Sequence, residues 1–491
     1  MKQLDEPNVV LPLAASYNTR GIAGYTNAIT NALDQRKVNA VYELFKNPLT
    51  GKDTLYVVKR PGVADVGSTY GTSGQVGYLW EVAAGASTNA AANRWVFSTI
   101  SNDCRASNSS TTTVIVTASG YAPAFVDKTA ISGTDTVVVQ LRHTDGTQDA
   151  YYSSAIGTFT QISDSTFTGL AHQGKMEHLN GYAHISTRNR IYSSALNSLS
   201  QWDDISFIDR QAKQDIGTGL AKLGRQIISF GTATMEIYET SGSATGSPLV
   251  YTGAAFDNGL ASTIVTGQRH YSAVVDGRLY WVGDNPKGVF TFNGQTVEKV
   301  SSLAVDKILS ERQYYFVSAI GWQGQRVLSI GLDTPSATTQ RALWFMPRWN
   351  DWFEFSSTVW IPQASTRLQN VCLGVDQNQH KLYAISETSD NWQDAGGNFT
   401  RTLQVQLPTT GNARNFMRWL GLKGTIERSA CTETVSVSDD DGQNWTSIGT
   451  IDRAADKQHI YRIGSYRRRQ LRFVNSTNHE GRVEALIARV E

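Results

Sequence analysis

The stretch LGRQIISFGTATMEIYETSG (Leu223–Gly242) contains the local pattern on which the fold of this 491-residue chain depends. The apolar run Gln226–Gly231 follows a Leu-Gly turn, and a second, aromatic run, Met235–Thr240, follows after a short break. Two such runs that follow one another across a turn are typical of a β-hairpin. The stretch therefore predicts antiparallel strands.

The same pattern returns at nearly regular intervals along the chain. When Ala183, Ile227, Leu279, Val327 and Leu382 are taken as equivalent, their successive separations are 44, 52, 48 and 55 residues. Repeats of about 40–50 residues with four strands each are typical of β-propeller blades, because one blade cannot cover its own apolar faces. We predict an all-β chain with a β-propeller of six or seven blades. An ordinary β-sandwich with irregular loops is the alternative.

Composition supports the β class and excludes several functions. Only 18% of residues are charged, and Gly is frequent at 42 residues, so turns and strands are favoured over long helices. The formal net charge is +1, which argues against a protein that grips DNA by neutralising phosphates. Cys104, Cys372 and Cys431 lie far apart without zinc spacing, so we expect no disulfide scaffold, metal or other cofactor. We also expect no secretory signal and no stable membrane insertion.

The pattern changes along the chain and indicates three parts. We predict an N-terminal arm or interface segment over residues 1–38 and a propeller with loop insertions over 39–400. Longer alternating strands over 401–491 predict a C-terminal β-sandwich-like domain. One short surface helix is expected within Ser301–Arg312, where a serine cap precedes apolar residues.

A turn motif stands near the C-terminus. SDDDGQNW (Ser438–Trp445) resembles the Asp-box of sialidases through Ser438, Asp440, Gly442 and Trp445. In that motif the carboxylate caps backbone amides, so we predict a structural turn rather than part of a catalytic site. Calcium binding by the three adjacent aspartates is the alternative, but adjacent carboxylates point to opposite faces and supply too few converging oxygens.

Two groups of basic residues are candidate partner contacts. The first is N-terminal, with Arg20, Arg36 and Lys37, and the second lies on an expected strand, with Arg467, Arg468, Arg469 and Arg472. Guanidinium groups pair well with carboxylates of a partner subunit or with DNA phosphates. The alternative is a solvated edge strand whose charges prevent unwanted strand pairing.

Catalytic motifs are missing from the sequence. It contains no HExxH, no GxSxG and no Gly-rich phosphate loop, so we predict no catalytic residues. The pair Asp203-Asp204 resembles a glycosidase carboxylate pair, although a turn explains it equally well. Four tryptophans are dense enough for a sugar-stacking platform, with core packing as the simpler explanation. They are Trp344, Trp349, Trp352 and Trp360.

Several blocks of the chain resemble one known family. They are SYNTRGIAGYTNAITNALDQRKVNAVYELFKN followed by Thr54–Val63, the pattern R-x-I-x-x-F-G-x-x-T-x-E-x-Y within Leu223–Gly242, and Gly288–Ser302. These blocks resemble the P22-type packaged-DNA stabilisation proteins of short-tailed phages, also called tail hub or nozzle proteins. Residues 64–175 match little of the family.

The resemblance implies a structural virion protein without enzymatic activity. It implies a homohexameric ring below the portal and adaptor that extends the DNA channel, retains packaged DNA until ejection and helps mount tail fibres or spikes. The implied partners are further copies of the chain, portal and adaptor proteins, fibre, spike or needle proteins, and double-stranded DNA in the channel. The implied location is the virion tail, with assembly in the host cytoplasm. A carbohydrate-binding or sialidase-like propeller, acting as an adhesin or depolymerase, is the alternative.

Overall fold

The structure is a computed structural model, and it divides into two compact units. Unit 1 comprises Met1–Ala64, Thr339–Val359 and Ile385–Glu491, and unit 2 comprises Asp65–Thr338 and Trp360–Ala384. The residues that the structure describes are 9–13, 36–46, 51, 53–69, 75–81, 94–100, 103–107, 112–117, 121–143, 148–154, 158–213, 215–243, 246–261, 271–284, 286–311, 316–322, 324–332, 339–365, 372–376, 381–385, 392–407, 414–425, 431–440, 442–455 and 458–491.

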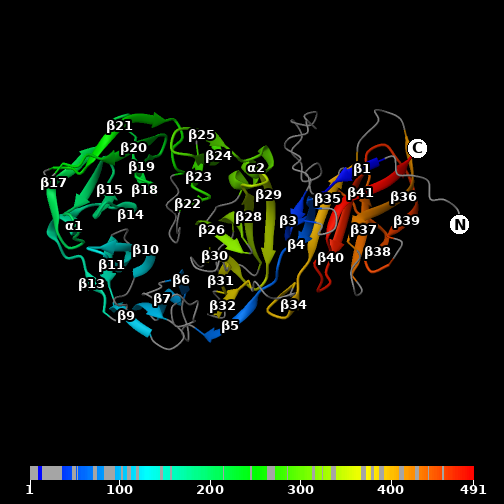
Figure 1. Cartoon of the computed structure of the whole chain (residues 1–491), viewed down its shortest axis with the longest axis horizontal. Helices are drawn as coiled ribbons and strands as arrows, with labels where there is room; N and C mark the ends of the chain where they lie inside the picture. The colour runs from blue at the N-terminus through cyan, green and yellow to red at the C-terminus, as the bar shows by residue number, and fades with distance from the viewer. Residues whose placement is uncertain are drawn as a thin grey trace. The chain divides into compact units, whose positions relative to one another are not determined.

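Unit 2 is a β-propeller, as predicted. Its described residues form six four-stranded sheets, arranged around a common centre in Figure 1, and one further hairpin. The sheets are β6 (Gln75–Glu81), β7 (Arg94–Ile100), β8 (Asp103–Ser107) and β9 (Thr112–Thr117); β10 (Tyr121–Ile131), β11 (Thr134–His143), β12 (Gln148–Ser153) and β13 (Thr160–Gln161); β14 (Gln173–Leu179), β15 (Tyr182–Ser186), β16 (Arg190–Ser194) and β17 (Trp202–Asp209); β18 (Gly217–Leu223), β19 (Gln226–Gly231), β20 (Met235–Thr240) and β21 (Leu249–Phe256); β22 (Ser272–Val275), β23 (Arg278–Asp284), β24 (Lys287–Phe292) and β25 (Val297–Lys299); and β30 (Ile361–Ser365), β31 (Cys372–Asp376), β32 (Lys381–Ala384) and β5 (Ala64–Thr69). The hairpin is β26 (Phe316–Trp322) with β27 (Gln325–Gly331).

The predicted repeat holds for four of its five reference residues. Ala183, Ile227, Leu279 and Val327 lie in β15, β19, β23 and β27, each the second strand of its sheet or hairpin. The equivalence of Leu382 is wrong, because it lies in β32, the third strand of its sheet. Neighbouring strands of a blade share the same apolar alternation, so spacing alone does not identify the strand.

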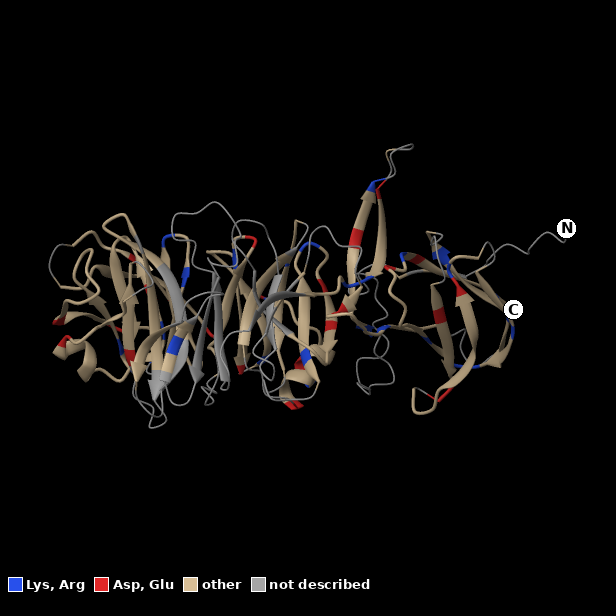
Figure 2. Cartoon of the chain, turned by 90° about the horizontal axis from the view of Figure 1, so that it is seen from below, with Lys and Arg blue, Asp and Glu red and all other residues tan. Residues whose placement is uncertain are grey.

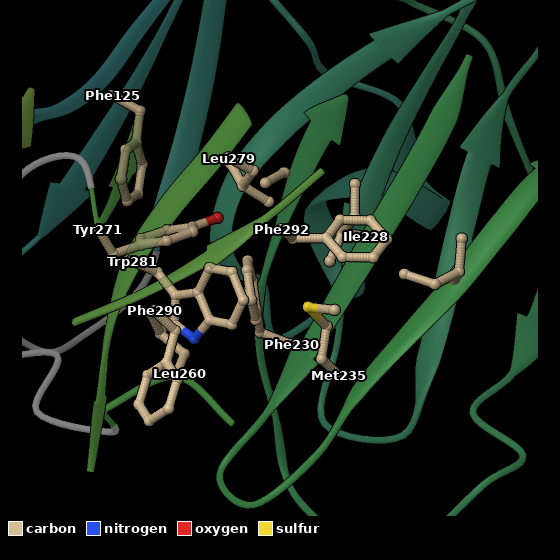
Figure 3. Close-up of a cluster of buried hydrophobic side chains, with 12 residues drawn as sticks. Phe125, Ile228, Phe230, Met235, Leu260, Tyr271, Leu279, Trp281, Phe290 and Phe292 are labelled. Carbon is tan, nitrogen blue, oxygen red and sulfur yellow. The ribbon is translucent and has the colours of Figure 1, made fainter. Parts of the chain in front are cut away.

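Apolar side chains fill the space between neighbouring blades. Figure 3 shows one such cluster, in which Phe230 of β19 and Trp281 of β23 have ring centroids 5.3 Å apart. Phe125 of β10 joins the same cluster through Tyr271, at 5.8 Å. Each blade therefore covers its neighbour's apolar face, which is the reason that blades occur in rings.

Two helices accompany the blades. The helix α2 (Leu303–Glu311) lies within the predicted range and buries Val305 and Leu309. The helix α1 (Ser165–Gly169) was not predicted, and Asp164 caps it by accepting from the backbone N–H of Thr166 at 2.9 Å. Five residues are too few to give a periodic sequence signal.

Unit 1 is also built from strands, in two sheets. In one sheet the order is β3 (Ala40–Lys46), β4 (Asp53–Lys59), β41 (Val483–Val490), β36 (Asn415–Gly424) and β39 (His459–Tyr466), and β1 (Val9–Pro12) pairs with β41. In the other, neighbours in order are β28 (Gln340–Met346), β29 (Asp351–Ser357), β2 (Lys37–Val38), β35 (Arg401–Gln406), β40 (Gln470–Asn475), β37 (Thr432–Ser438) and β38 (Thr446–Asp452). A small pair, β33 (Gln393–Asp394) and β34 (Gly397–Asn398), completes the unit.

The C-terminal strands thus lie in two sheets, in keeping with the predicted sandwich-like domain. They do so together with strands from far earlier in the chain: β1, β2, β3 and β4 pair within the same sheets. Unit 1 therefore draws on all three predicted ranges, 1–38, 39–400 and 401–491, and those bounds stay a prediction.

Candidate functional site

The N-terminal basic residues form ion pairs inside unit 1. The Arg36 guanidinium lies 2.6 and 2.5 Å from the two carboxylate oxygens of Glu354. Lys37 Nζ lies 2.5 Å from Asp351 Oδ2 and 2.7 Å from the Tyr42 hydroxyl, and burial lowers the pKa of Lys37. Arg20 lies outside the described residues. A partner contact by these cations stays a prediction, and Arg36 and Lys37 already have carboxylate partners in their own chain.

The C-terminal arginines lie at a chain reversal. Arg467, Arg468 and Arg469 form the turn between β39 and β40, so their placement in a strand was wrong. Arg467 and Arg468 are exposed, whereas the buried Arg469 guanidinium donates to both carboxylate oxygens of Asp439, at 2.7 Å each. Arg472 lies in β40 as expected, with its guanidinium 4.3 Å from the centroid of the Trp445 ring.

Ser438, Asp440, Gly442 and Trp445 belong to one hydrogen-bonded turn. Asp440 Oδ1 accepts from the Asn444 backbone N–H at 2.9 Å and from the Ser438 hydroxyl at 2.7 Å. The Trp445 indole N–H donates to the Gly442 carbonyl at 3.0 Å, and Gly442 has a φ of +82° that favours glycine. Donation by Asn444, followed by that of Ser438, lowers the pKa of Asp440 to about 2. Both oxygens are engaged in the turn.

We expect Asp440→Ala to lower the melting temperature of the protein by the same amount with excess calcium as with EDTA. The physical reason is that the carboxylate accepts hydrogen bonds within the turn instead of binding a cation. Asp440→Asn keeps an acceptor oxygen and should lose less. A wild-type melting shift of several degrees on adding calcium, absent in Asp440→Ala, would instead establish a metal site.

A buried cluster of charges in unit 1 was missed by the sequence analysis. The Arg60 guanidinium, which is 0% exposed, donates to both carboxylate oxygens of Asp394 at 2.9 and 2.6 Å. The same carboxylate accepts from the Ser357 hydroxyl at 2.8 Å. Arg401 forms a second fully buried pair with Glu433. Nothing in the sequence signals these pairs, because 334 residues separate Arg60 from Asp394.

Lys59 is a third cation of this cluster, and its surroundings differ from those of Arg60 and Arg401. Its Nζ donates to the Thr477 carbonyl at 2.7 Å and lies 4.2 Å from the centroid of the Phe399 ring. Burial, followed by the charges of Arg401 and Arg60, lowers its pKa from 10.5 to about 7. Asp394 and Cys431 oppose this shift. The cluster therefore disfavours a charge on Lys59.

This arrangement predicts a pH dependence of stability. Between pH 7 and 10.5 the unfolded chain binds a proton at Lys59 that the folded chain releases, so stability should rise with pH across this window. Below pH 7 both states bind the proton and this contribution is constant. Melting temperatures at pH 7 and 10 should therefore differ less in Lys59→Met than in the wild type. Lys423→Met, at an exposed lysine, is the control, and an unchanged pH profile in Lys59→Met would contradict the prediction.

The blade motif of Leu223–Gly242 builds a buried polar network. Glu236, 0% exposed, accepts from the Tyr238 hydroxyl at 2.6 Å, and its other oxygen lies 3.5 Å from Arg210. Asp215 Oδ1 lies 3.0 Å from Arg210 Nη1, and Asp215 Oδ2 accepts from the backbone N–H of Thr234 at 2.9 Å. A Cβ on Gly231 would lie 2.1 Å from Asp215 Oδ2, so a larger residue there would displace the Asp215 carboxylate from this network. These hydrogen bonds and ion pairs of the motif residues therefore stabilise the blade.

The four tryptophans on which the carbohydrate-binding alternative depends pack against other residues of the chain. Trp344 and Trp360 are buried, and Trp349 and Trp352 are partly buried against Tyr42 and Phe345 at 5.9 and 4.8 Å. Asp203 and Asp204 are exposed on β17.

Within the described part of the chain, no group of three or more His, Cys, Asp or Glu side chains is placed to hold a metal ion. No helix among those residues has the length and apolarity needed to cross a membrane.

Residues 108–330 match a family model described as "Bacteriophage P22 Gp10, beta-propeller". This match confirms the resemblance noted in the sequence and covers somewhat less than half of the chain. It extends into residues 108–175, where the sequence comparison had found little. A search of curated proteins gives no match.

Solved structures add distant likenesses. An exo-β-1,3-galactanase from Phanerochaete chrysosporium is 8% identical, with a TM-score of 0.26, over 74% of this chain and 96% of its own. Hsv2 of Kluyvelomyces marxianus is 9% identical, with a TM-score of 0.31, over 69% of this chain and 99% of its own. At such TM-scores these likenesses carry no argument about function.

Proposed function

We propose, from the premise that residues 108–330 belong to the β-propeller of a P22-type packaged-DNA stabilisation protein, that this chain is a hub of a short-tailed phage tail. The family match is the observation that carries the proposal. In this role six copies form a ring below the portal and adaptor, extend the DNA channel and retain packaged DNA. The ring also offers surfaces to tail fibres or spikes, and the chain catalyses no reaction.

The charge distribution suits such a conduit. The net charge is +1, and Figure 2 shows basic and acidic residues interspersed over the described part of both units. Each phosphate that a protein neutralises adds binding free energy, so a channel wall with positive charges only would hold DNA in place. A channel wall that carries both positive and negative charges lets the DNA slide. Several basic side chains are also engaged by carboxylates of the same chain, as with Arg36, Arg60 and Arg469.

Purified virions test the proposal. Quantitative mass spectrometry should find the chain in particles, at six copies for each portal ring. Particles made without it should lose their DNA, which becomes sensitive to added nuclease. A chain that is absent from virions, or particles that keep their DNA without it, would overturn the proposal.

Catalysis is tested separately. Purified wild-type protein should release no reducing sugar from host surface polysaccharides or sialosides. Release of sugar that is lost in Asp203→Asn/Asp204→Asn would favour the depolymerase alternative instead.

A further inference from the structure

Two blades of unit 2 differ from others in the last strand of the sheet. β17 and β21 have 8 residues each, whereas β13 and β25, at the same position in their sheets, have 2 and 3. Short edge strands protect a sheet from pairing with another chain. Long edge strands with exposed apolar side chains instead mark a contact surface.

A bulge in β17 directs an apolar side chain outward. Tyr192 pairs with Phe207 and Ser194 with Trp202, so the residues Asp203–Ser206 stand opposite Ser193 alone. Asp203 Oδ1 accepts from the backbone N–H of Ile205 at 3.1 Å, which stabilises the bulge. Ile205 is 66% exposed, the highest value among the large hydrophobic residues that the structure describes. Bulges commonly re-aim side chains in this way.

The neighbouring blade continues the same surface. The Ser206 hydroxyl donates to the Gly246 carbonyl, just before β21, at 3.3 Å. Val250 of β21 is 47% exposed, and Asp203 and Asp204 are exposed beside Ile205. We name Asp203, Asp204, Ile205 and Val250 the acidic rim. It combines apolar side chains with two carboxylates, for which the described residues provide no ion pair.

Unit 1 carries a surface of opposite charge. Tyr461, 50% exposed, and Arg462 lie on β39, the last strand of its sheet, and Arg467 is exposed in the turn that follows. Arg469 braces that turn by donating to the Ile463 carbonyl at 3.2 Å. We name Tyr461, Arg462 and Arg467 the basic turn. Tyr and Arg are the residue types enriched at protein interfaces.

We propose that the acidic rim of one copy docks on the basic turn of a second copy. Asp203 and Asp204 carry charges opposite to those of Arg462 and Arg467. Ile205 packs against the Tyr461 ring in this contact. Both surfaces are present on every copy and differ from one another, which is what a head-to-tail contact that closes into a ring requires. The inference rests on the proposed function, because it names the contact that builds the ring.

Charge reversal tests the contact. Asp203→Lys/Asp204→Lys and Arg462→Asp/Arg467→Asp should each lower the yield of chemically cross-linked multimers about tenfold, since two surface ion pairs become repulsive. Asp is also tolerated at position 462, where φ is +59°. Combining all four substitutions should restore the yield. The control is Asp257→Lys/Glu298→Lys, at two other exposed carboxylates of unit 2, which should assemble normally. Normal assembly of both test variants, or failure of the combination to restore it, would overturn the proposal.

Disulfide trapping identifies which protein contacts the acidic rim. In a Cys372→Ser background, Ile205→Cys with Tyr461→Cys should give disulfide-linked multimers of the chain in oxidised particles, because the other native cysteines, Cys104 and Cys431, are buried. Ile205→Cys with Leu303→Cys, at an exposed position on α2, should not. Trapping of a different virion protein, or no more multimer than in the control, would overturn the docking proposal. If the chain were absent from particles, the proposed function would fail, and trapping in concentrated purified protein would still decide the docking.

Discussion

Asp394→Ala is expected to destabilise unit 1 by about 3–5 kcal/mol. The substitution leaves the Arg60 guanidinium, 0% exposed, without the two carboxylate oxygens that it now contacts at 2.9 and 2.6 Å. Arg60 also lies 3.7 Å from the centroid of the Phe399 ring and donates to Asn39 Oδ1 at 3.0 Å. These contacts hold it in place, so it cannot turn to water when its partner is lost.

Thermal and denaturant unfolding measure this loss, and two variants separate its cause. Arg60→Met/Asp394→Leu removes both charges and should be more stable than Asp394→Ala, because no uncompensated charge remains buried. Glu484→Ala breaks the exposed pair with Lys423, at 2.7 Å, and should cost about 0–1 kcal/mol. Equal losses for Asp394→Ala and Glu484→Ala would show that the buried pair contributes no more than a surface pair.

The propeller could be predicted from the sequence because its signals are local and repeated. A turn such as Asp276-Gly277 and the alternating strand after it depend on a few neighbouring residues, and both reappear in blade after blade. The same repetition explains the misplacement of Leu382, since adjacent strands of one blade look alike. The turn at Ser438–Trp445 is also local: the hydrogen bonds among Ser438, Asp440, Gly442, Asn444 and Trp445 each join residues at most four positions apart.

The charged groups of unit 1 could not be predicted in the same way. Arg36 was a candidate for partner contacts because it belongs to a group of basic residues. Its carboxylate partner, Glu354, lies 318 residues away in the sequence, where no local pattern reveals it. The strand placement of Arg467–Arg469 failed because a run of arginines carries no turn signal of its own. Pairing between distant segments depends on how the sheets assemble, and a single sequence does not display it. The charge clusters therefore did not indicate which residues their members pair with in the folded chain.

Trp281→Ala is expected to destabilise the propeller by about 3–5 kcal/mol. Trp281 is 0% exposed at the centre of the cluster in Figure 3, with ring centroids 5.3 Å from Phe230 and 5.9 Å from Phe290. Because the cluster joins the sheets β18–β21 and β22–β25, the cavity would lie between two blades. Neither sheet can close it without moving against its other neighbour, so relaxation should recover little of the loss.

Trp281→Phe is the matched control, and it isolates packing from hydrogen bonding. The indole N–H of Trp281 has no hydrogen-bond partner among the described residues, and an unpaired buried donor costs about 1–3 kcal/mol. Phenylalanine removes that donor while it keeps an aromatic ring against Phe230, so the loss should stay below about 1.5 kcal/mol. Melting curves of both variants, followed by far-ultraviolet circular dichroism, compare the two losses. Similar melting temperatures for Trp281→Ala and Trp281→Phe would mean that the contact between these blades does not depend on filling this space.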